Sequence, residues 1–232
     1  DGYTDGRSGN PTVTSFEMIP ANAVEMVLAD IDGTRDPLPS NLAWRVLMEV
    51  SFSDEAMARK TLETALETAF EKGLIQDAAI AESVAQARAM WMVRETIPLS
   101  KRAYGNSLNQ DISVPVSKIP AFMETCNARI VEKLPTADFV IFGHVGDGNL
   151  HYSVIEAAGK SGLKENFNAL TRIIYDTVME FDGSISAEHG VGRLKRDELA
   201  KLRPQAATDT MRAIKRALDP KGIMNPNRVV SV

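Results

Sequence analysis

The chain has little of several residue types that would point to particular protein classes. Cys126 is the only cysteine among 232 residues, so no disulfide can form within the chain. No apolar run approaches the roughly 18 residues that a membrane-spanning helix needs, and no signal peptide is visible. We therefore expect a cytoplasmic protein without a membrane span.

Basic residues are too few for a nucleic-acid surface. Lys and Arg number 26 against 31 Asp and Glu, which gives a formal net charge of −5, and the pI is about 5.3. Nucleic-acid-binding domains usually carry basic patches and a high pI, so we expect no nucleic-acid partner. Hydrophobic residues make up 44% of the chain, enough for a sizeable core. The sequence leaves the oligomeric state open, a homo-oligomer included.

Histidine is also scarce, and its placement is informative. All three histidines lie in two glycine-flanked segments, 143–151 (GHVGDGNLH) and 186–192 (SAEHGVG). Histidine changes charge near neutral pH and is the commonest metal ligand. Three imidazoles and the carboxylate of Glu188 therefore predict one site assembled from two loops.

The first segment predicts a β-hairpin. Asp147-Gly148 suits the two central positions of a type I′ turn, and apolar runs flank it on both sides. This register pairs His144 with His151, with Cβ atoms about 4.5–5.5 Å apart, on the face that also carries Phe142 and Ser153. Two such imidazoles can share a tetrahedral metal ion, whose bonds to nitrogen are about 2.0–2.1 Å long. The alternative is a structural histidine stack at a sheet edge.

The second segment supplies a carboxylate and a third imidazole. Neighbours on a strand point to opposite faces, so Glu188 and His189 reach one site only if the backbone turns, as Gly190 and Gly192 permit. Glu188 would complete a metal ligand set with an open position, which is typical of catalytic sites. His189 would then serve as a general base. The alternative is an exposed loop with a chance Glu-His pair.

These segments resemble the C-terminal domain of FAD-linked oxidases, a family that includes D-lactate dehydrogenase, the glycolate oxidase flavin subunit and D-2-hydroxyglutarate dehydrogenase. The resemblance extends from about residue 16 to about residue 230 and rests on four motifs in the family's order: 91–95 (WMVRE), 142–151, 185–192 and 218–226 (LDPKGIMNP). It implies flavin-dependent oxidation of a small 2-hydroxy acid.

The resemblance also implies roles for individual residues. The family's metal ligands, usually for zinc or manganese, match His144, His151 and Glu188. The base near the substrate hydroxyl matches His189, and the arginine that holds the substrate carboxylate matches Arg94. Asn225 falls in the tail that approaches the flavin. Hydride would pass from the substrate to FAD.

The sequence departs from the family pattern at positions that bear on substrate choice. Members that act on 2-hydroxyglutarate carry a threonine and a lysine for the second carboxylate, where this chain has Pro98 and Asn109. These departures favour a lactate-like or glycolate-like substrate. The tail reads Asn225-Pro226-Asn227-Arg228, where the family usually shows Gly and then Lys.

The range over which the sequence resembles the family predicts the domain organisation. Residues 1–15 are rich in turn formers and are interpreted as a linker or the remnant of an interdomain segment, and 16–232 as the substrate and metal domain. No glycine-rich flavin-phosphate loop is visible. The resembled family holds its flavin mainly in an N-terminal FAD-binding domain, which we take to be absent from this chain. We expect the chain alone to be inactive.

Hydrophobic periodicity predicts an α+β fold with helices on one face of an antiparallel sheet. The predicted strands are 44–52, 78–81, 111–115 and a hairpin over 138–155. The predicted helices are 54–72 capped by Asp54, 82–96 ended by Pro98, 117–133 capped by Ser117, 164–181, 196–202 and 206–218. The resemblance narrows the fold to a ferredoxin-like core with an inserted helical segment near residues 82–105.

Two other functions remain open at this level. A stand-alone metal hydrolase would use metal-bound water with His189 as base, and it would need no flavin. A non-catalytic domain with a structural ion would need a closed set of four ligands, whereas the residues here predict only three.

Overall fold

The computed structural model describes residues 12–39, 41–52, 54–103, 105–156 and 159–231. Its centre is a five-stranded antiparallel sheet with the strand order β2-β1-β4-β5-β3. The strands are β1 (Thr12–Pro20), β2 (Trp44–Ser51), β3 (Ser107–Ser113), β4 (Ala137–His144) and β5 (Asn149–Glu156).

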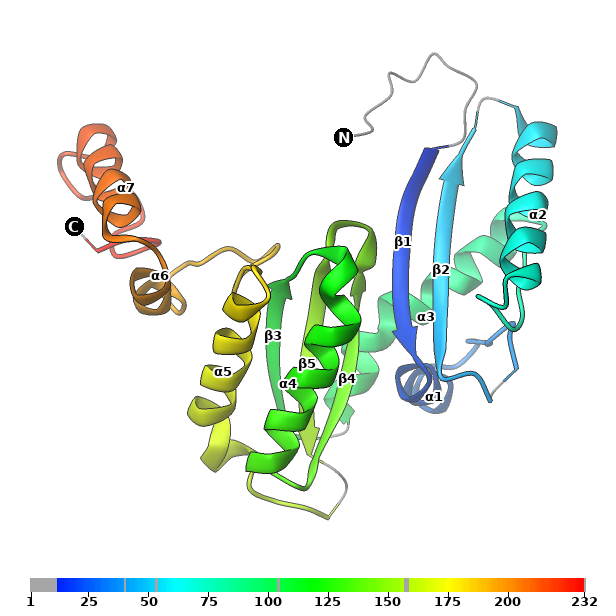
Figure 1. Cartoon of the computed structure of the whole chain (residues 1–232), viewed down its shortest axis with the longest axis horizontal. Helices are drawn as coiled ribbons and strands as arrows, with labels where there is room; N and C mark the ends of the chain where they lie inside the picture. The colour runs from blue at the N-terminus through cyan, green and yellow to red at the C-terminus, as the bar shows by residue number, and fades with distance from the viewer. Residues whose placement is uncertain (1–11, 40, 53, 104, 157–158, 232) are drawn as a thin grey trace.

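Two sets of helices cover the two faces of this sheet (Figure 1). On one face, α4 (Ile119–Lys133) and α5 (Leu163–Glu180) pack with Leu150, Tyr152 and Val154 of β5. On the other face, α1 (Ala21–Asp30) and α3 (Val84–Ala103) pack with alternate strand residues such as Phe142. The period of two along each strand therefore separates the two cores.

The strand and helix order confirms the predicted α+β, ferredoxin-like core. The chain runs β3-α4-β4-β5-α5, and a single antiparallel bridge from Ser184 to Ser113 then follows on the outer side of β3. The helical segment predicted near 82–105 is α3, which lies on the face opposite to α4 and α5 (Figure 1). β1 begins at Thr12, inside the segment 1–15 that the sequence assigns to a linker.

The hairpin forms, but its turn is longer than predicted. β4 and β5 pair Phe142 with His151, and a 3₁₀ turn over Val145–Asp147 is closed by Gly148 with φ 83°. The predicted pairing of His144 with His151 is therefore wrong by two residues. Since side chains repeat every two residues along a strand, the shift leaves both histidines on the predicted face.

Helix α2 (Glu55–Glu71) begins where the sequence predicts. The carboxylate of Asp54 accepts hydrogen bonds from the backbone N–H groups of Ala56 and Met57, which confirms the predicted cap. Its apolar positions are only half-buried, at Ala58, Leu62, Leu66 and Ala69. This helix lies at the outer side of β2 (Figure 1), and its Arg59 is 3.5 Å from Glu82, just before α3.

Three local predictions are wrong. Residues 78–81 form no strand, although Ala78, Ile80 and Ala81 are half-buried. Ser117 does not cap α4, whose N-terminus instead carries a proline in its first turn. Pro98 does not end α3: burial of Val93 and Ile97, about 1.5–3 kcal/mol each, offsets the roughly 3 kcal/mol cost of an internal proline.

The C-terminal part leaves the sheet after residue 185. Helices α6 (Arg196–Leu202) and α7 (Gln205–Leu218) occur where the sequence predicts them and lie beyond α5 (Figure 1). Arg172 of α5 contacts Glu198 of α6 at 2.7 Å. The loop that carries the second histidine motif, 186–192, is thus held between the sheet and these helices.

Candidate active site

One face of β4, β5 and β3 carries most of the candidate residues, and we call it the site face. The register places Phe142, His151 and Asp111 in one row across the three strands, and Val140, Ser153 and Asn109 in the next. Asn149 begins β5 on the same face, and α3 covers this face from outside. Polar groups therefore alternate with the apolar residues that pack under α4 and α5.

His144 and His151 are diagonal neighbours on the site face. Their ring centroids are 5.6 Å apart, with an angle of 74° between the rings. His151 also lies 4.9 Å from the Phe142 ring. Burial, together with the charge of Arg94, lowers the pKa of His151, which favours the neutral imidazole that binds metals.

Glu188 reaches the two histidines from the loop that follows the antiparallel bridge between Ser184 and Ser113 of β3. Its Oε1 is 3.2 Å from Nε2 of His144, and one donor atom each from His144, His151 and Glu188 lie within 4.8 Å of one another. Two imidazoles and a carboxylate at this spacing can converge on one divalent cation with a position left for another ligand. The structure thus brings the three predicted ligands together.

Asp111 fixes the loop that delivers Glu188. Its Oδ2 accepts hydrogen bonds from the backbone N–H groups of Ala187, Glu188 and His189 at 3.2, 2.8 and 2.9 Å. Burial alone would raise the pKa of Asp111, but these donors and the nearby positive charges hold it below its usual value. Lys195 adds to the anchor, since its Nζ donates to the backbone carbonyls of Asp111 and Ile185.

Glu17 of β1 links the metal-ligand cluster with Arg94. It is 1% exposed, its Oε1 lies 2.6 Å from Nδ1 of His144, and its Oε2 accepts a hydrogen bond of 2.8 Å from Nε of Arg94. Burial opposes the charged form, yet the bonds to His144 and Arg94 leave the pKa of Glu17 lowered. A buried, ionised carboxylate therefore orients both side chains.

Arg94 is buried at 6% exposure on α3, directly over the site face. Its guanidinium carbon is 4.7 Å from the centroid of the Phe142 ring. Within the described part of the chain, only its Nε is engaged by a carboxylate, that of Glu17. The two terminal nitrogens keep the fork geometry that suits a carboxylate ligand.

His189 lies beside the trio of His144, His151 and Glu188 rather than in it. Its ring stacks on His151 with centroids 6.3 Å apart and an angle of 30°, and its side chain is 68% exposed. The loop thus turns as predicted, with Gly190 and Gly192 both at positive φ. The imidazole of His189 therefore lies next to the trio and open to solvent.

Asn225 is placed apart from these residues. It is exposed and has a left-handed backbone with φ 47°. The tail contacts the second histidine motif through the backbone N–H of Val229, which donates to the carbonyl of Gly192 at 2.8 Å. The flavin contact of Asn225 therefore stays a prediction from the sequence.

Sequence reasoning missed Glu17 and Asp111 as site residues. Glu17 and Asp111 are single acidic residues next to apolar ones in strands that have a buried face. A buried acid within a strand requires a partner, and this was the available signal.

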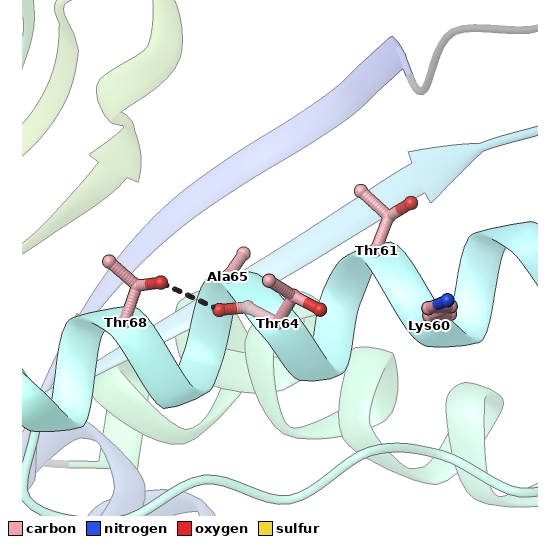
Figure 2. Close-up of a pocket in the computed structure, with 5 residues that line it drawn as sticks. All are labelled: Lys60, Thr61, Thr64, Ala65 and Thr68. Carbon is pink, nitrogen blue, oxygen red and sulfur yellow. Dashed lines mark hydrogen bonds between the residues drawn. The ribbon is translucent and has the colours of Figure 1, made fainter.

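A surface depression lies elsewhere, on α2. Figure 2 shows its lining residues, Lys60, Thr61, Thr64, Ala65 and Thr68. They all belong to one helix, and the only bond drawn among them joins the Thr68 hydroxyl to the Thr64 carbonyl at 2.9 Å. This depression brings together no acid, base or metal ligand set, so the histidine cluster is the better candidate for chemistry.

Comparison with known proteins shows which family this chain belongs to. The family model for the C-terminal domain of FAD linked oxidases matches residues 7–229. D-2-hydroxyglutarate dehydrogenases from Arabidopsis thaliana and Stutzerimonas stutzeri are 34% and 35% identical over 94% of this chain. The chain spans 38% and 47% of the lengths of those two relatives.

Solved structures support the fold. A 4-ethylphenol oxidase from Gulosibacter chungangensis matches 93% of this chain with a TM-score of 0.58, and a p-cresol methylhydroxylase matches 94% with 0.60. Each has 13% sequence identity, and the chain covers 47% of each. Among the described residues, no helix has the length and apolar character that crossing a bilayer requires.

Proposed function

Because the chain belongs to the family of FAD linked oxidase C-terminal domains, we propose that it is the substrate- and metal-binding half of a flavin-dependent 2-hydroxy acid dehydrogenase. The observation that carries the proposal is the convergence of His144, His151 and Glu188 beside the buried guanidinium of Arg94. The names of the relatives, which are 2-hydroxy acid dehydrogenases, support it.

The donor set fits a divalent ion such as zinc or manganese. Imidazole and carboxylate suit both metals, and Glu17 behind Nδ1 of His144 leaves Nε2 as the nitrogen facing Glu188. Such a backing carboxylate is the usual outer partner of a metal-bound histidine. We propose His144, His151 and Glu188 as the ligands.

The chain's own residues would bind and orient the substrate. Arg94 would hold the 1-carboxylate with its terminal nitrogens, and His189 would accept the proton of the 2-hydroxyl group. When bound, the ion would acidify that hydroxyl, and FAD would supply the hydride acceptor. Asn225 is our candidate for a contact with FAD, which an N-terminal FAD-binding domain would hold for the most part.

The length of the substrate is a separate question. Pro98 and Asn109 favour a lactate-like or glycolate-like acid, whereas the relatives are named for the dicarboxylate 2-hydroxyglutarate. The cytoplasmic location and a homo-oligomer stay predictions, and the names of some relatives place those proteins in mitochondria.

The proposal is tested in the protein that contains this chain together with its FAD-binding domain. We expect about one divalent ion per chain by elemental analysis and reduction of a dye by 2-hydroxy acids. His151→Ala should lose the ion and the activity, because two remaining ligands hold an ion poorly. Asp138→Ala, at the far end of the same hairpin, should retain both.

Each outcome separates the competing functions. Equal metal content in the wild type and His151→Ala would refute the ligand set. Hydrolysis without any requirement for FAD would favour the stand-alone metal hydrolase. A bound ion without turnover of any 2-hydroxy acid would favour the non-catalytic domain with a structural ion.

A further inference from the structure

Each of the two histidines among the proposed ligands has an acidic residue as its register partner on a neighbouring strand. Glu17 of β1 pairs with His144 of β4. In the same way, Asp111 of β3 pairs with His151 of β5. Directly opposed residues of antiparallel strands carry their side chains on the same face, with Cβ atoms about 4.5–5.5 Å apart. Strand pairing therefore places one carboxylate beside each imidazole.

The two pairs differ in how close the carboxylate comes to the ring. Oε1 of Glu17 lies 2.6 Å from Nδ1 of His144, which is hydrogen-bond distance. Oδ1 of Asp111 lies 4.0 Å from Nδ1 of His151, beyond that distance. Asp111 is only 4% exposed, and its Oδ1 accepts no hydrogen bond from the residues that the structure describes. A buried carboxylate oxygen without a donor costs free energy, and the register places the imidazole of His151 beside it.

The other carboxylate oxygen of Asp111 is fully engaged. Oδ2 accepts hydrogen bonds from three consecutive backbone N–H groups, those of residues 187–189. The main chain of Asp111 is held as well, because Nζ of Lys195 donates to its carbonyl at 3.1 Å. Oδ2 thus supports the loop that carries Glu188, and Oδ1 is the oxygen that remains for His151.

A histidine binds a metal ion through a nitrogen that carries no proton. A hydrogen bond from Nδ1–H to a carboxylate fixes the tautomer in which Nε2 keeps its lone pair for the ion. Glu17 is in position to do this for His144. For His151, the acceptor at the equivalent position across the strands is Oδ1 of Asp111.

We propose that Asp111 is a positioning residue for two of the three metal ligands. Its Oδ1 accepts the Nδ1–H of His151 when Nε2 binds the ion, while its Oδ2 holds the loop that carries Glu188. The inference rests on the proposed function, because it requires these two residues and His144 to be the ligands. One buried carboxylate thus connects the tautomer of His151 with the position of Glu188.

The first test measures Zn²⁺ binding by Asp111→Asn in the protein that also contains the FAD-binding domain. The asparagine carbonyl can still accept from the N–H groups of 187–189, which turns its NH₂ group toward Nδ1 of His151. That nitrogen must then accept, so the proton moves to Nε2. We expect Zn²⁺ to bind about 10- to 100-fold more weakly. Hydrogen–deuterium exchange of the 187–189 amides in the zinc-free protein should stay close to that of the wild type.

A matched control and a second readout separate the tautomer from a purely structural effect. Asp138→Asn, at an exposed position near the far end of the same hairpin, should bind Zn²⁺ like the wild type. ¹⁵N NMR of histidine-labelled protein, recorded well above the usual imidazole pKa of about 6.5, distinguishes the two ring nitrogens, and His151→Ala identifies the signal. The proton should be on Nδ1 of His151 in the wild type and on Nε2 in Asp111→Asn.

The outcomes distinguish this inference from the function on which it rests. Equal Zn²⁺ binding by the wild type and His151→Ala would refute the ligand set and with it the proposed function. If the ligand set holds, wild-type Zn²⁺ affinity in Asp111→Asn would overturn the role of Asp111. A proton on Nε2 of His151 in the wild type would also overturn it, and this measurement needs no variant. Weaker binding with faster exchange at 187–189 and an unchanged tautomer would overturn the contact with His151.

Discussion

Oε1 of Glu17 lies 2.6 Å from Nδ1 of His144, across neighbouring antiparallel strands at the centre of the sheet. Glu17 and His144 are register partners, so the contact is fixed by strand pairing and does not depend on a flexible loop. The carboxylate holds the ring so that Nε2 faces Glu188. The geometry of the candidate metal site therefore begins in the buried sheet.

Removing the negative charge of Glu17 should weaken metal binding. Glu17→Gln keeps the size of the side chain but not its charge, and the loss of an outer partner typically lowers metal affinity by about 10- to 100-fold. Metal titration of the purified protein measures the effect. Glu95→Gln, at an exposed position of α3, is the control. Unchanged affinity in Glu17→Gln would show that the carboxylate serves Arg94 alone.

Arg94 should determine substrate affinity. In the holoenzyme, Arg94→Ala should raise KM by about 10- to 100-fold through loss of a charge-assisted contact. Arg94→Lys should also raise KM, because lysine lacks the planar fork. Either change also leaves the buried carboxylate of Glu17 without its partner. The double variant Glu17→Gln/Arg94→Gln removes that charge, so it separates the loss of the substrate contact from the effect of an unpaired Glu17. A KM equal to that of the wild type in Arg94→Ala would remove this arginine from substrate binding.

His189 should affect turnover and not metal content. Its backbone N–H donates to Asp111 at 2.9 Å, whereas its ring Nδ1 lies 3.9 Å from the same carboxylate, so His189→Ala should leave the loop and Glu188 in place. Loss of a general base lowers kcat by about 10²- to 10⁴-fold. Steady-state kinetics and elemental analysis on the same preparation check both parts. Loss of the ion would instead make His189 a ligand.

Local periodicity predicted most elements and the side of the sheet on which His144 and His151 lie. The hairpin register shifted by two residues because a 3₁₀ turn replaced the two-residue turn, yet an even shift preserves the face. Pro98 shows the limit of local rules. A proline inside a helix costs free energy, but the burial of α3 residues on both sides of Pro98 lets the helix continue through it.

The missing part of the site prediction is long-range. Glu17 contacts Arg94 and His144 across 77 and 127 residues, and no local pattern encodes such pairs. Lys101 reaches Asn109 only because α3 crosses over β3 and β5. The histidine motifs were recognisable from residue type and spacing, whereas their supporting groups became visible only through the packing of β1 and α3.

The pKa of Lys101 predicts an unusual pH dependence of stability. An unfolded lysine titrates near 10.5, and this one titrates near 8 in the folded protein. Between these values the unfolded state holds more protons, so Lys101 lowers stability as the pH falls from about 10.5 to about 8, and the loss is complete below that. The interval corresponds to about 3 kcal/mol.

Replacement of Lys101 by an apolar side chain should therefore stabilise the ligand-free protein at neutral pH. Lys101→Met should raise the free energy of unfolding at pH 7 by roughly 1–3 kcal/mol, since Ser153 and Asn109 keep their mutual hydrogen bond. Most of the gain should be lost near pH 10.5, where the lysine is neutral in the folded state and half-protonated in the unfolded state. Urea denaturation of both proteins at the two pH values, with Arg102→Gln as control, measures it. If Lys101→Met is less stable than the wild type by the same amount at both pH values, burial of the charged lysine does not lower the free energy of unfolding.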